Sequence, residues 1–482
     1  MKRYGEKDGF RFFFQFLNFQ KQFTVKAINF MKKTRQHALA GLNPGGYYTA
    51  IWSRDASYIL RDWFLTGTII DRTLHQIHLI WSHQITRFNK KIIYGRGSPE
   101  MKFLSVIADR DIQRKFEGAL PTTIYQDDND KNKNHNYSEV YAQNPDIDST
   151  ALMISTSSWI FEVLLREGVG QKLSSSTKSS LSTSTQNEKE KERKDIIGFV
   201  VPRMLKAIDY LESRDIDGDG LLEQNHNEDW MDTVLRAGKI VYSQACWILA
   251  LNDFAYLLSR LGRDIDAARL RKLADKAISG VELKLWSEQD GCYIDIQPSH
   301  HIGGPYRTLT QDVSLYLVAI TEDLGDNNSL KAHRRTGKES DDSSIRRTSV
   351  NRNIRDRSLS TLDAIKSRLW KDKWPLITEV ELKSTGPWVL KPNFYHNHTF
   401  WPWATGIEML ARSRFDRLEE CAILLSKLAS EDHPHTHAFY EWINPITDKA
   451  HGAYPFRTGV SAVRIAIADI LWKQNLMKSN HA

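Results

Sequence analysis

The feature that most constrains the fold is a series of helical segments with almost no strand-like alternation between them. In one of these segments Leu152, Trp159, Ile160 and Val163 share a single helical face, which is the spacing of a helix that packs on a core. The sequence therefore predicts an all-α chain of about eleven to twelve helices joined by long loops. The predicted helices cover residues 56–70, 71–88, 148–165, 197–214, 239–261, 265–285, 310–324, 360–369, 399–412, 415–429 and 459–473.

Two stretches interrupt this pattern with a sharp change of composition. Residues 172–195 are rich in Ser and Thr and then in Lys and Glu, and residues 326–357 are rich in Arg, Ser and Asp. Such segments bury too little apolar surface to offset the entropy of ordering them. We expect two disordered surface insertions within one catalytic domain at 37–482, preceded by a basic and aromatic lead-in at 1–36.

The net charge of +7 does not indicate a nucleic-acid partner. The two insertions supply six of the seven positive charges, and the remainder of the chain is nearly neutral. No apolar run approaches the roughly 20 residues of a membrane span, so no membrane partner is expected. Cys246, Cys292 and Cys421 are odd in number and far apart. This cysteine usage favours a reducing, cytoplasmic compartment and no zinc site.

The richest chemistry lies between Asp215 and Trp247. After a glycine-punctuated acidic turn, this stretch carries Glu223, Glu228, Asp229 and Asp232 around Trp230. Carboxyls beside an aromatic wall suit the cleavage of a glycosidic bond, because an apolar site keeps one of them protonated at neutral pH. Acidic residues before a helix also serve as caps, so the local pattern leaves capping open as the alternative.

Two further patterns resemble metal sites. Asp215, Asp217 and Asp219 match the start of a calcium-binding EF-hand loop, but His226 occupies the twelfth position, where a bidentate Glu is required. We therefore interpret this segment as a tight turn. The run His433-Pro-His-Thr-His437 has no second ligand cluster, and we interpret it as a loop. No metal and no cofactor are expected.

Four motifs, in order along the chain, resemble those of a known group of enzymes. Tyr47-Tyr-Thr-Ala-Ile-Trp-Ser-Arg-Asp55 is similar to an element of glucoamylases and glycogen-debranching glucosidases. Asp217-Gly-Asp-Gly-Leu221 with Trp230-Met-Asp232 resembles the central segment of the amylo-α-1,6-glucosidase family. Tyr395-His-Asn-His-Thr-Phe-Trp-Pro-Trp403 and Phe439-Tyr-Glu-Trp-Ile-Asn-Pro-Ile-Thr-Asp448 are similar to elements of glycoside hydrolase family 63. His398 and Asp448 stand where these elements have glycine.

The resemblance implies an (α/α)6 toroid, in which six helical hairpins form a ring with the site at one mouth. It also implies an inverting glycoside hydrolase, with Asp232 as general acid and Glu441 as general base. Inversion needs two carboxyls on opposite faces of the sugar, about 6.5–9.5 Å apart. Because Asp232 and Glu441 are far apart in sequence, only a closed tertiary scaffold brings them together. The residues expected to contact the sugar are Trp52, Arg54, Asp55, Asp148, Asn227, Trp230, His396, Trp401 and Tyr440.

The expected substrate is an α-glucoside, such as an α-1,6-linked stub of glycogen or a related oligosaccharide. The sequence leaves open a small α-glycoside, such as trehalose, glucosylglycerate or mannosylglycerate, because Pro44-Gly-Gly-Tyr-Tyr48 is also similar to trehalases. A non-catalytic carbohydrate-binding toroid is the alternative from a different class. The oligomeric state does not follow from the sequence.

Overall fold

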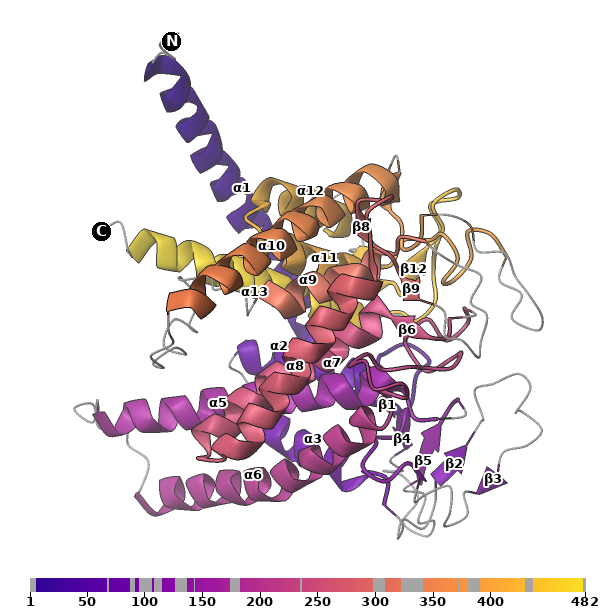
Figure 1. Cartoon of the computed structure of the whole chain (residues 1–482). Coiled ribbons are helices and arrows are strands. Elements are labelled where there is room, and N and C mark those ends of the chain that lie inside the picture. Colours follow the sequence, from indigo (N-terminus) through magenta and orange to yellow (C-terminus); the bar gives the residue numbers. More distant parts are fainter. Residues whose placement is uncertain are drawn as a thin grey trace.

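Helices dominate the computed structural model of the chain (Figure 1). The structure describes residues 6–66, 69–86, 92–94, 106–107, 115–125, 137–142, 144–173, 183–234, 236–297, 308–321, 341–371, 373–379, 381, 391–429 and 437–479. Twelve α-helices lie in these ranges. No helix in the described ranges is both long enough and apolar enough to cross a membrane.

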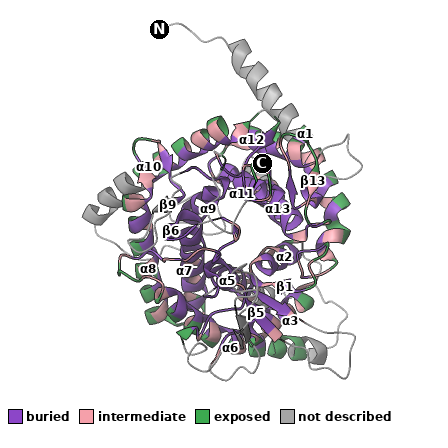
Figure 2. Cartoon of the chain, turned by 90° about the vertical axis from the view of Figure 1, so that its right-hand side faces the viewer, coloured by how far each residue is buried: buried purple, intermediate pink, exposed green. Residues whose placement is uncertain are grey.

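Six of the helices form a closed inner ring. Each contacts the next in chain order, and the last contacts the first, so that the ring has no open edge (Figure 2). These helices are α2 (Ser53–Leu65), α5 (Ile147–Leu173), α7 (Val241–Arg260), α9 (Ser314–Thr321), α11 (Pro402–Arg414) and α13 (Arg457–Ser479).

The other six helices alternate with these along the chain and lie outside the ring (Figure 2). The resulting architecture is an (α/α)6 toroid, and it confirms the predicted fold class. The outer helices are α1 (Glu6–Leu39), α3 (Ile70–Ser82), α6 (Thr183–Glu212), α8 (Asp264–Lys284), α10 (Asp341–Leu369) and α12 (Leu418–Leu428).

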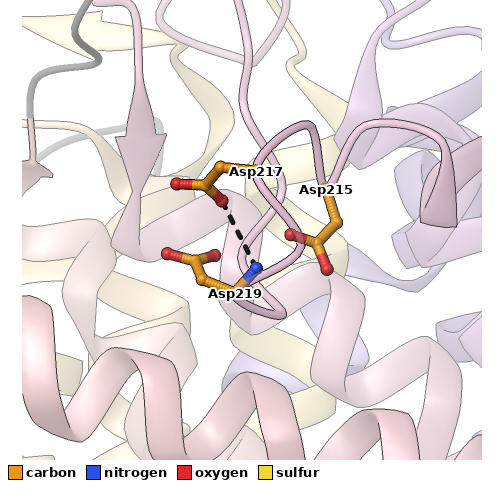
Figure 3. A group of neighbouring side chains, drawn as sticks. All are labelled: Asp215, Asp217 and Asp219. Atoms are coloured by element: carbon orange, nitrogen blue, oxygen red, sulfur yellow. Dashed lines mark hydrogen bonds between the residues drawn. The ribbon is translucent and has the colours of Figure 1, made fainter.

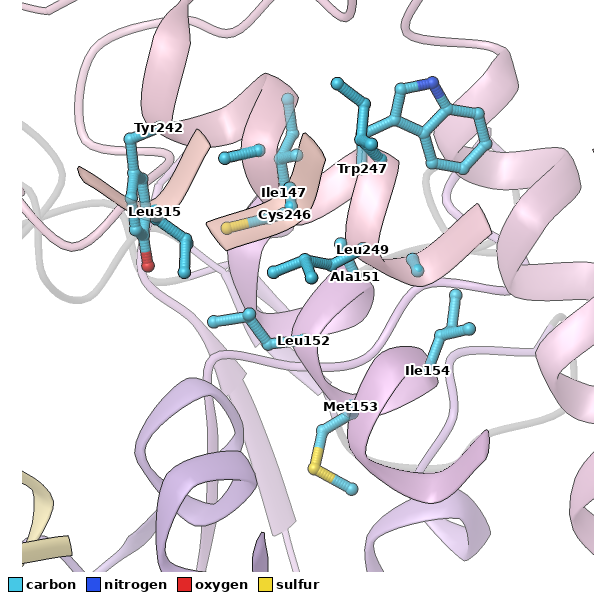
Figure 4. Packing of buried hydrophobic residues seen from close by; sticks show 14 of the residues in the cluster. Ile147, Ala151, Leu152, Met153, Ile154, Tyr242, Cys246, Trp247, Leu249 and Leu315 are labelled. Atoms are coloured by element: carbon cyan, nitrogen blue, oxygen red, sulfur yellow. The ribbon is translucent and has the colours of Figure 1, made fainter. Parts of the chain in front are cut away.

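Burial explains which helices are inside. Every residue of α9 is buried, whereas α8 buries a single stripe that includes Ala267, Leu270, Ala274 and Ala277. A helix that is apolar on all sides needs neighbours on all sides, while a one-stripe helix suits the outside of a ring. Figure 4 shows the contact between two inner helices, with Ala151, Leu152 and Ile154 of α5 near Cys246 and Leu249 of α7.

Short strands gather at one end of the ring, on the right in Figure 1. They were not predicted, because strands of two to four residues are too short to show alternation. A five-stranded sheet has the order β1-β4-β5-β2-β3. Its members are β1 (Ile51–Trp52), β2 (Ile92–Tyr94), β3 (Val106–Ile107), β4 (Thr123–Tyr125) and β5 (Tyr137–Val140).

Four two-stranded pairs complete this end of the molecule. They are β6 (Lys239–Ile240) with β9 (Ile296–Gln297), β7 (Trp286–Ser287) with β8 (Cys292–Tyr293), β10 (Trp370–Lys371) with β11 (Trp374–Pro375), and β12 (Trp442–Ile443) with β13 (Ala450–His451). Two 3-10 turns, η1 (Gln311–Val313) and η2 (His437–Phe439), also lie between helices. The inner helices begin at this end, and their N-termini favour nearby carboxylates.

The two expected insertions differ from the prediction in part. Helix α6 begins at Thr183 and helix α10 at Asp341, so each helix starts inside a segment expected to be disordered. Lys and Glu are good helix formers, and pairs such as Lys194–Glu190 (2.8 Å) add i,i+4 support. Residues 174–182 and 322–340 lie outside the described residues.

The expected boundary at residue 36 falls inside a helix. Helix α1 runs to Leu39 and buries Phe23, Ala27 and Phe30 against the body of the ring. The described part of the lead-in is therefore an outer helix of the toroid. The basic composition suggested a separate segment. The helical spacing of the three buried side chains instead lets this helix pack on the core.

Candidate active site

A pocket of about 500 Å3, open solvent at its mouth included, lies at the end of the ring where the inner helices begin. Asp232 and Glu441 both line it, although 209 positions separate them in the sequence. Of the residues expected to contact sugar, Trp52, Arg54, Asp55, Trp230, His396 and Trp401 line the same pocket. The remaining lining residues are Pro44, Tyr48, Tyr395, Trp403, Phe456 and Thr458.

Three of the expected sugar contacts do not line the pocket. Asp148 lies behind Arg54, with 3.7 Å between its Oδ2 and the Nη1 of Arg54. Asn227 is buried with a positive φ of 67°. The ring of Tyr440 packs against Tyr454, 4.9 Å between centroids. Motif position identified their loops, but the direction of each side chain depends on tertiary packing.

Glu441 is held by four hydrogen-bond donors. Tyr48 Oη donates to Oε1 at 2.8 Å, and Tyr395 Oη donates to the same oxygen at 3.3 Å. Oε2 accepts from Tyr47 Oη at 3.1 Å and from the backbone N–H of Ala453 at 2.7 Å. Burial raises the pKa of Glu441 above its usual value, and these four donors oppose that effect. Donors of this kind stabilise the ionised carboxylate.

Gly45, Gly46 and Gly452 lie near Glu441 at positions where a larger side chain would collide with its neighbours. Gly45 and Gly46 adopt φ of 104° and 56°, and a Cβ on Gly45 would lie 2.0 Å from the carbonyl oxygen of Pro455. This tight turn directs Tyr47 and Tyr48 toward the carboxylate. A Cβ on Gly452 would lie 2.3 Å from Oε2 of Glu441. These positions therefore require glycine for Glu441 to keep its place.

Asp232 has the opposite surroundings. It lies in the loop between α6 and β6, and its side chain is 29% exposed to the pocket. Within the described part of the chain its Oδ1 has no hydrogen-bond partner, and the nearest ring nitrogen, Nδ1 of His396, is 3.8 Å away. Burial raises the pKa of Asp232 to about 7; Arg54 opposes the rise, and the carboxyls of Asp229 and Glu441 add to it.

His396 is neutral in this environment. Burial lowers the pKa of His396 well below its usual value, and the positive charges of Arg54 and Arg236 lower it further. Its Nδ1 lies 2.8 Å from Oγ1 of Thr233. A neutral imidazole beside Asp232 leaves that carboxyl without a cationic partner on this side, which favours its protonated form.

The floor of the pocket is a fixed charged pair. Arg54 and Asp55 occupy the first turn of α2, with 3.1 Å between Arg54 Nη2 and Asp55 Oδ2. Thr458 Oγ1, from the first turn of α13, donates to Asp55 Oδ1 at 2.6 Å. This link joins the first and last inner helices at the pocket. Such buried, oriented groups can hold the hydroxyls of a sugar.

Buried charged side chains fix the position of Trp230 in the aromatic wall of the pocket. Trp230 packs against Trp403 with the rings tilted and 4.4 Å between centroids, and it donates its indole N–H to Asp312 Oδ2 at 2.7 Å. The fully buried Arg236 contacts that same oxygen at 2.8 Å and Asp229 at 3.2 Å. A wall anchored by a charged hydrogen bond keeps one orientation, which suits a sugar-stacking surface.

Asp215, Asp217 and Asp219 lie together in the acidic turn (Figure 3), and none of them lines this pocket. Three lysines occupy its surroundings: Lys239 contacts Asp217 at 2.6 Å and also Asp219, Lys276 contacts Asp215 at 3.2 Å, and Lys284 contacts Asp219. Burial acts to raise the pKa of Asp219, but the lysines outweigh it and lower the pKa to about 2. The turn is thus held by lysine–carboxylate pairs. Of the histidine run, only His437 lies within the described residues.

His398 and Asp448 adopt the backbone conformation that glycine favours at these motif positions. Their φ values are 57° and 56°, in the left-handed region that favours glycine. His398 Nδ1 lies 2.8 Å from the carbonyl of Thr378, and Asp448 accepts from the indole N–H of Trp374 at 2.7 Å. Neither side chain lines the pocket, so these departures from the motifs do not fill it.

Sequence reasoning overlooked the tyrosines that surround the proposed base. Tyr47, Tyr48 and Tyr395 lie inside two motifs, but nothing in those motifs says which side chain turns toward Glu441. The adjacent Gly45-Gly46 turn was the available signal, because such turns place the following residues close to another segment.

Comparison with known proteins agrees with this architecture. No protein-family model matches the sequence, and no curated protein matches it. The structure is similar to a glycoside hydrolase family 63 mannosylglycerate hydrolase from Thermus thermophilus in complex with Tris and D-glycerate, with a TM-score of 0.55, 13% identity, and coverage of 92% of this chain and 99% of that chain. It is also similar to a glycosidase variant in complex with glucose, with a TM-score of 0.50, 13% identity, and coverage of 94% and 98%.

These likenesses define the class of the fold. At 13% identity they show a six-hairpin toroid of the kind that glycoside hydrolases have, over nearly the whole of this chain. They do not point to a glycogen-debranching member of that class.

Proposed function

We propose that this chain is an inverting glycoside hydrolase that removes one hexose from an α-glycoside. The observation that carries the proposal is the pair of carboxyls in one pocket with opposite surroundings. Glu441 accepts four hydrogen bonds, whereas Asp232 has an oxygen without a partner among the described residues and a pKa raised to about 7 by burial. Two carboxyls whose environments differ in this way serve as base and acid.

In the proposed reaction Asp232 gives its proton to the glycosidic oxygen as the bond to the anomeric carbon breaks. Glu441 takes a proton from a water molecule, and the oxygen of that water bonds to the anomeric carbon from the opposite face. The products are the free alcohol and a hexose of inverted configuration. Arg54 and Asp55 orient the ring hydroxyls, and Trp230 and Trp401 cover its apolar face.

Two classes of α-glycoside fit this chemistry. The α-1,6-linked glucose stub of a branched glucan is one, and a small α-glycoside such as trehalose or a glycosylglycerate is the other. The neighbour named as a mannosylglycerate hydrolase is matched over 99% of its length, so it carries little beyond the toroid that this chain has. This likeness favours the small α-glycosides.

A hydrolysis screen tests the proposal directly. Trehalose, glucosylglycerate, mannosylglycerate, isomaltose and a limit dextrin are incubated with the full chain, and the anomer released first is read by proton NMR. We expect turnover of at least one small α-glycoside with initial release of the β-anomer. Initial release of the α-anomer overturns inversion. Binding of these sugars without hydrolysis would instead support a carbohydrate-binding toroid.

The role of Glu441 has a separate test. Glu441→Ala should be inactive on natural glycosides, and azide should restore turnover of an α-glycosyl fluoride to a β-glycosyl azide and fluoride, because a small anion can take the place of the activated water opposite the leaving group. Glu419→Ala, at an exposed glutamate on α12, is the matched control and should keep full activity. Ordinary activity in Glu441→Ala would remove this residue from the mechanism.

A further inference from the structure

The side chain of Asp232, the proposed acid, does little to hold itself in place. Its Oδ1 has no hydrogen-bond partner among the described residues, and the nearest ring nitrogen, on His396, is 3.8 Å away. A group that transfers a proton must nevertheless lie within about 2.6–3.2 Å of the oxygen that receives it. The position of the Asp232 carboxyl therefore depends on how firmly the neighbouring residues of its loop are held.

The residues just before Asp232 are held by buried carboxyls. Asp229 Oδ1 accepts from the backbone N–H of Met231 at 2.9 Å, which orders the chain immediately before Asp232. Trp230 donates its indole N–H to Asp312 Oδ2 at 2.7 Å. Asp312 belongs to η1, so this hydrogen bond attaches the loop to a segment far away in the sequence.

Arg236 joins these two attachments. Its guanidinium lies 3.2 Å from Asp229 Oδ2 and 2.8 Å from Asp312 Oδ2, the oxygen that also accepts the indole N–H. A third carboxyl, that of Asp295 just before β9, contacts the same guanidinium. The side chain of Arg236 is 1% exposed, and those of the three carboxyls are at most 4% exposed. One buried arginine thus connects the loop of the acid to η1 and to the β6–β9 pair.

The ion pair between Asp229 and Arg236 also closes the loop on itself. Asp232 lies near the middle of the segment between these two residues. Arg236 itself does not line the active-site pocket, and neither does Asp312. Any effect of Arg236 on the reaction must therefore pass through the residues that it holds.

Stability alone is a poor account of this cluster. Three carboxyls and a guanidinium lose their hydration when they are buried together, and apolar side chains in place of such a cluster are often neutral or stabilising. An arginine does offer a fixed geometry, because its planar guanidinium carries five N–H donors in set directions. A lysine ammonium on a flexible stem carries the same charge without that geometry.

We propose that Arg236 is a positioning residue for the general acid: it fixes Asp229 directly and Trp230 through Asp312, and it thereby sets the Asp232 carboxyl against the glycosidic oxygen. This inference rests on the proposed function, in which Asp232 protonates the leaving group. A misplacement of about 1 Å can cost about 10²-fold in rate, so even a small loss of fit at Arg236 should be measurable.

The substitution Arg236→Lys keeps the charge and removes the fixed geometry. Values of kcat are measured for the α-glycoside that the full chain hydrolyses best and for the matching α-glycosyl fluoride, whose fluoride leaves with little protonation. We expect kcat on the glycoside to fall by roughly 10–100-fold and kcat on the fluoride to change much less. Equal losses on both substrates would overturn the proposal, because a general loosening of the site would slow both.

Arg464→Lys is the matched control. Arg464 is likewise almost fully buried, lies 2.8 Å from a carboxylate oxygen of Asp62, and does not line the pocket. Its replacement should leave the ratio of the two rates unchanged, whatever it does to the melting temperature. A selective loss on the glycoside in Arg464→Lys would show that any weakened buried pair has this effect, and it would overturn the special role of Arg236.

A second substitution covers the case in which Arg236→Lys does not fold. Asp312→Asn weakens the ion pair through which Arg236 holds Trp230, and the change is isosteric. We expect the same selective loss of kcat on the glycoside. Equal losses on the glycoside and on the fluoride in this variant would also overturn the proposal.

The double variant Arg236→Lys with Asp232→Asn separates this inference from the proposed function. If Arg236 acts through Asp232, its substitution should cost little further once the acid is lost, and a full additional loss would overturn the inference. If Asp232→Asn alone slowed the fluoride as much as the glycoside, the proposed function would fail and this inference with it. A selective effect of Asp232→Asn without one of Arg236→Lys would overturn the inference alone.

Discussion

At the level of single residues, the proposed chemistry depends on what each carboxyl finds within hydrogen-bonding distance. Glu441 accepts from three tyrosine hydroxyls and one backbone N–H, whereas Oδ1 of Asp232 has no hydrogen-bond partner among the described residues and lies 3.8 Å from the ring of His396. The four donors favour the ionised form of Glu441, and burial favours the protonated form of Asp232.

The first prediction concerns Asp232 itself. Asp232→Asn should lower kcat by about 10²–10⁴-fold, the usual contribution of general acid catalysis. Substrates with good leaving groups should be affected much less, since they need little protonation. Steady-state rates on a natural glycoside and on a glycosyl fluoride provide the comparison. Asp264→Asn, at an exposed aspartate on α8, is the control; equal activity in both variants would remove Asp232 from the role.

The second prediction concerns pH. Asp232 has a folded-state pKa of about 7, and the reaction needs its protonated form. The rate constant kcat/KM should therefore fall as pH rises through about 7, and it should fall on the acid side as Glu441 becomes protonated. These limbs belong to the interacting pair as a whole. A pH profile of kcat/KM measures both, and an alkaline limb that persists unchanged in Asp232→Asn would contradict the assignment.

At the level of elements, closure of the ring depends on buried links between the first and last inner helices. Arg464 of α13 lies 2.8 Å from Asp62 of α2, and both side chains are almost fully buried. The same guanidinium donates to the carbonyl of Met31 at 2.7 Å and to Thr34 Oγ1 at 3.1 Å, both on α1. One arginine thus joins three helices where the chain begins and ends.

The third prediction follows from this link. Arg464→Met should lower the free energy of unfolding by about 3–5 kcal/mol, because it leaves the carboxylate of Asp62 buried without its partner. The exposed pair Arg263–Asp266, at 2.7 Å, provides the control, and Arg263→Met should cost less than about 1 kcal/mol. Denaturant titrations of both variants measure the two losses of stability. Similar midpoints would show that the buried pair stabilises the fold no more than the exposed pair.

At the level of the whole molecule, a closed ring needs all of its helices. Helix α1 is the first helix of the chain and lies outside the ring. It buries Phe23 and Phe30 against the body, and its Thr34 accepts a hydrogen bond from Arg464. Each buried aromatic of this size stabilises the fold by about 1.5–3 kcal/mol. That contribution is large beside a total stability of about 5–15 kcal/mol.

The fourth prediction is therefore that removal of residues 1–36 lowers the melting temperature sharply or prevents folding. Removal of residues 1–20 is the control, because it keeps Phe23 and Phe30. Calorimetry of the two truncated chains measures the difference. A shorter chain, starting at residue 37, that melts like the full-length protein would show that α1 is a dispensable lead-in after all.

The sequence by itself determined the parts of this protein that depend on local patterns. Helical spacing along the chain predicted most of the helices, because a helix that packs on a core must repeat its apolar positions every three to four residues. The elements that the sequence failed to predict also have local causes. The strands at the mouth were too short to show a period, and charged segments with a disordered composition extend α6 and α10 as helix.

Only the tertiary structure decided how the distant motifs meet. Closure of the ring brings Asp232 and Glu441 to one pocket, and it turns Tyr48 and Tyr395 toward Glu441 while leaving Asp148, Asn227 and Tyr440 outside the lining. It also creates a second pocket inside the ring, lined by residues of all six inner helices, which no local motif records. The physical reason is that side-chain direction and pKa depend on neighbours far away in sequence, and those neighbours exist only once the six inner helices have closed.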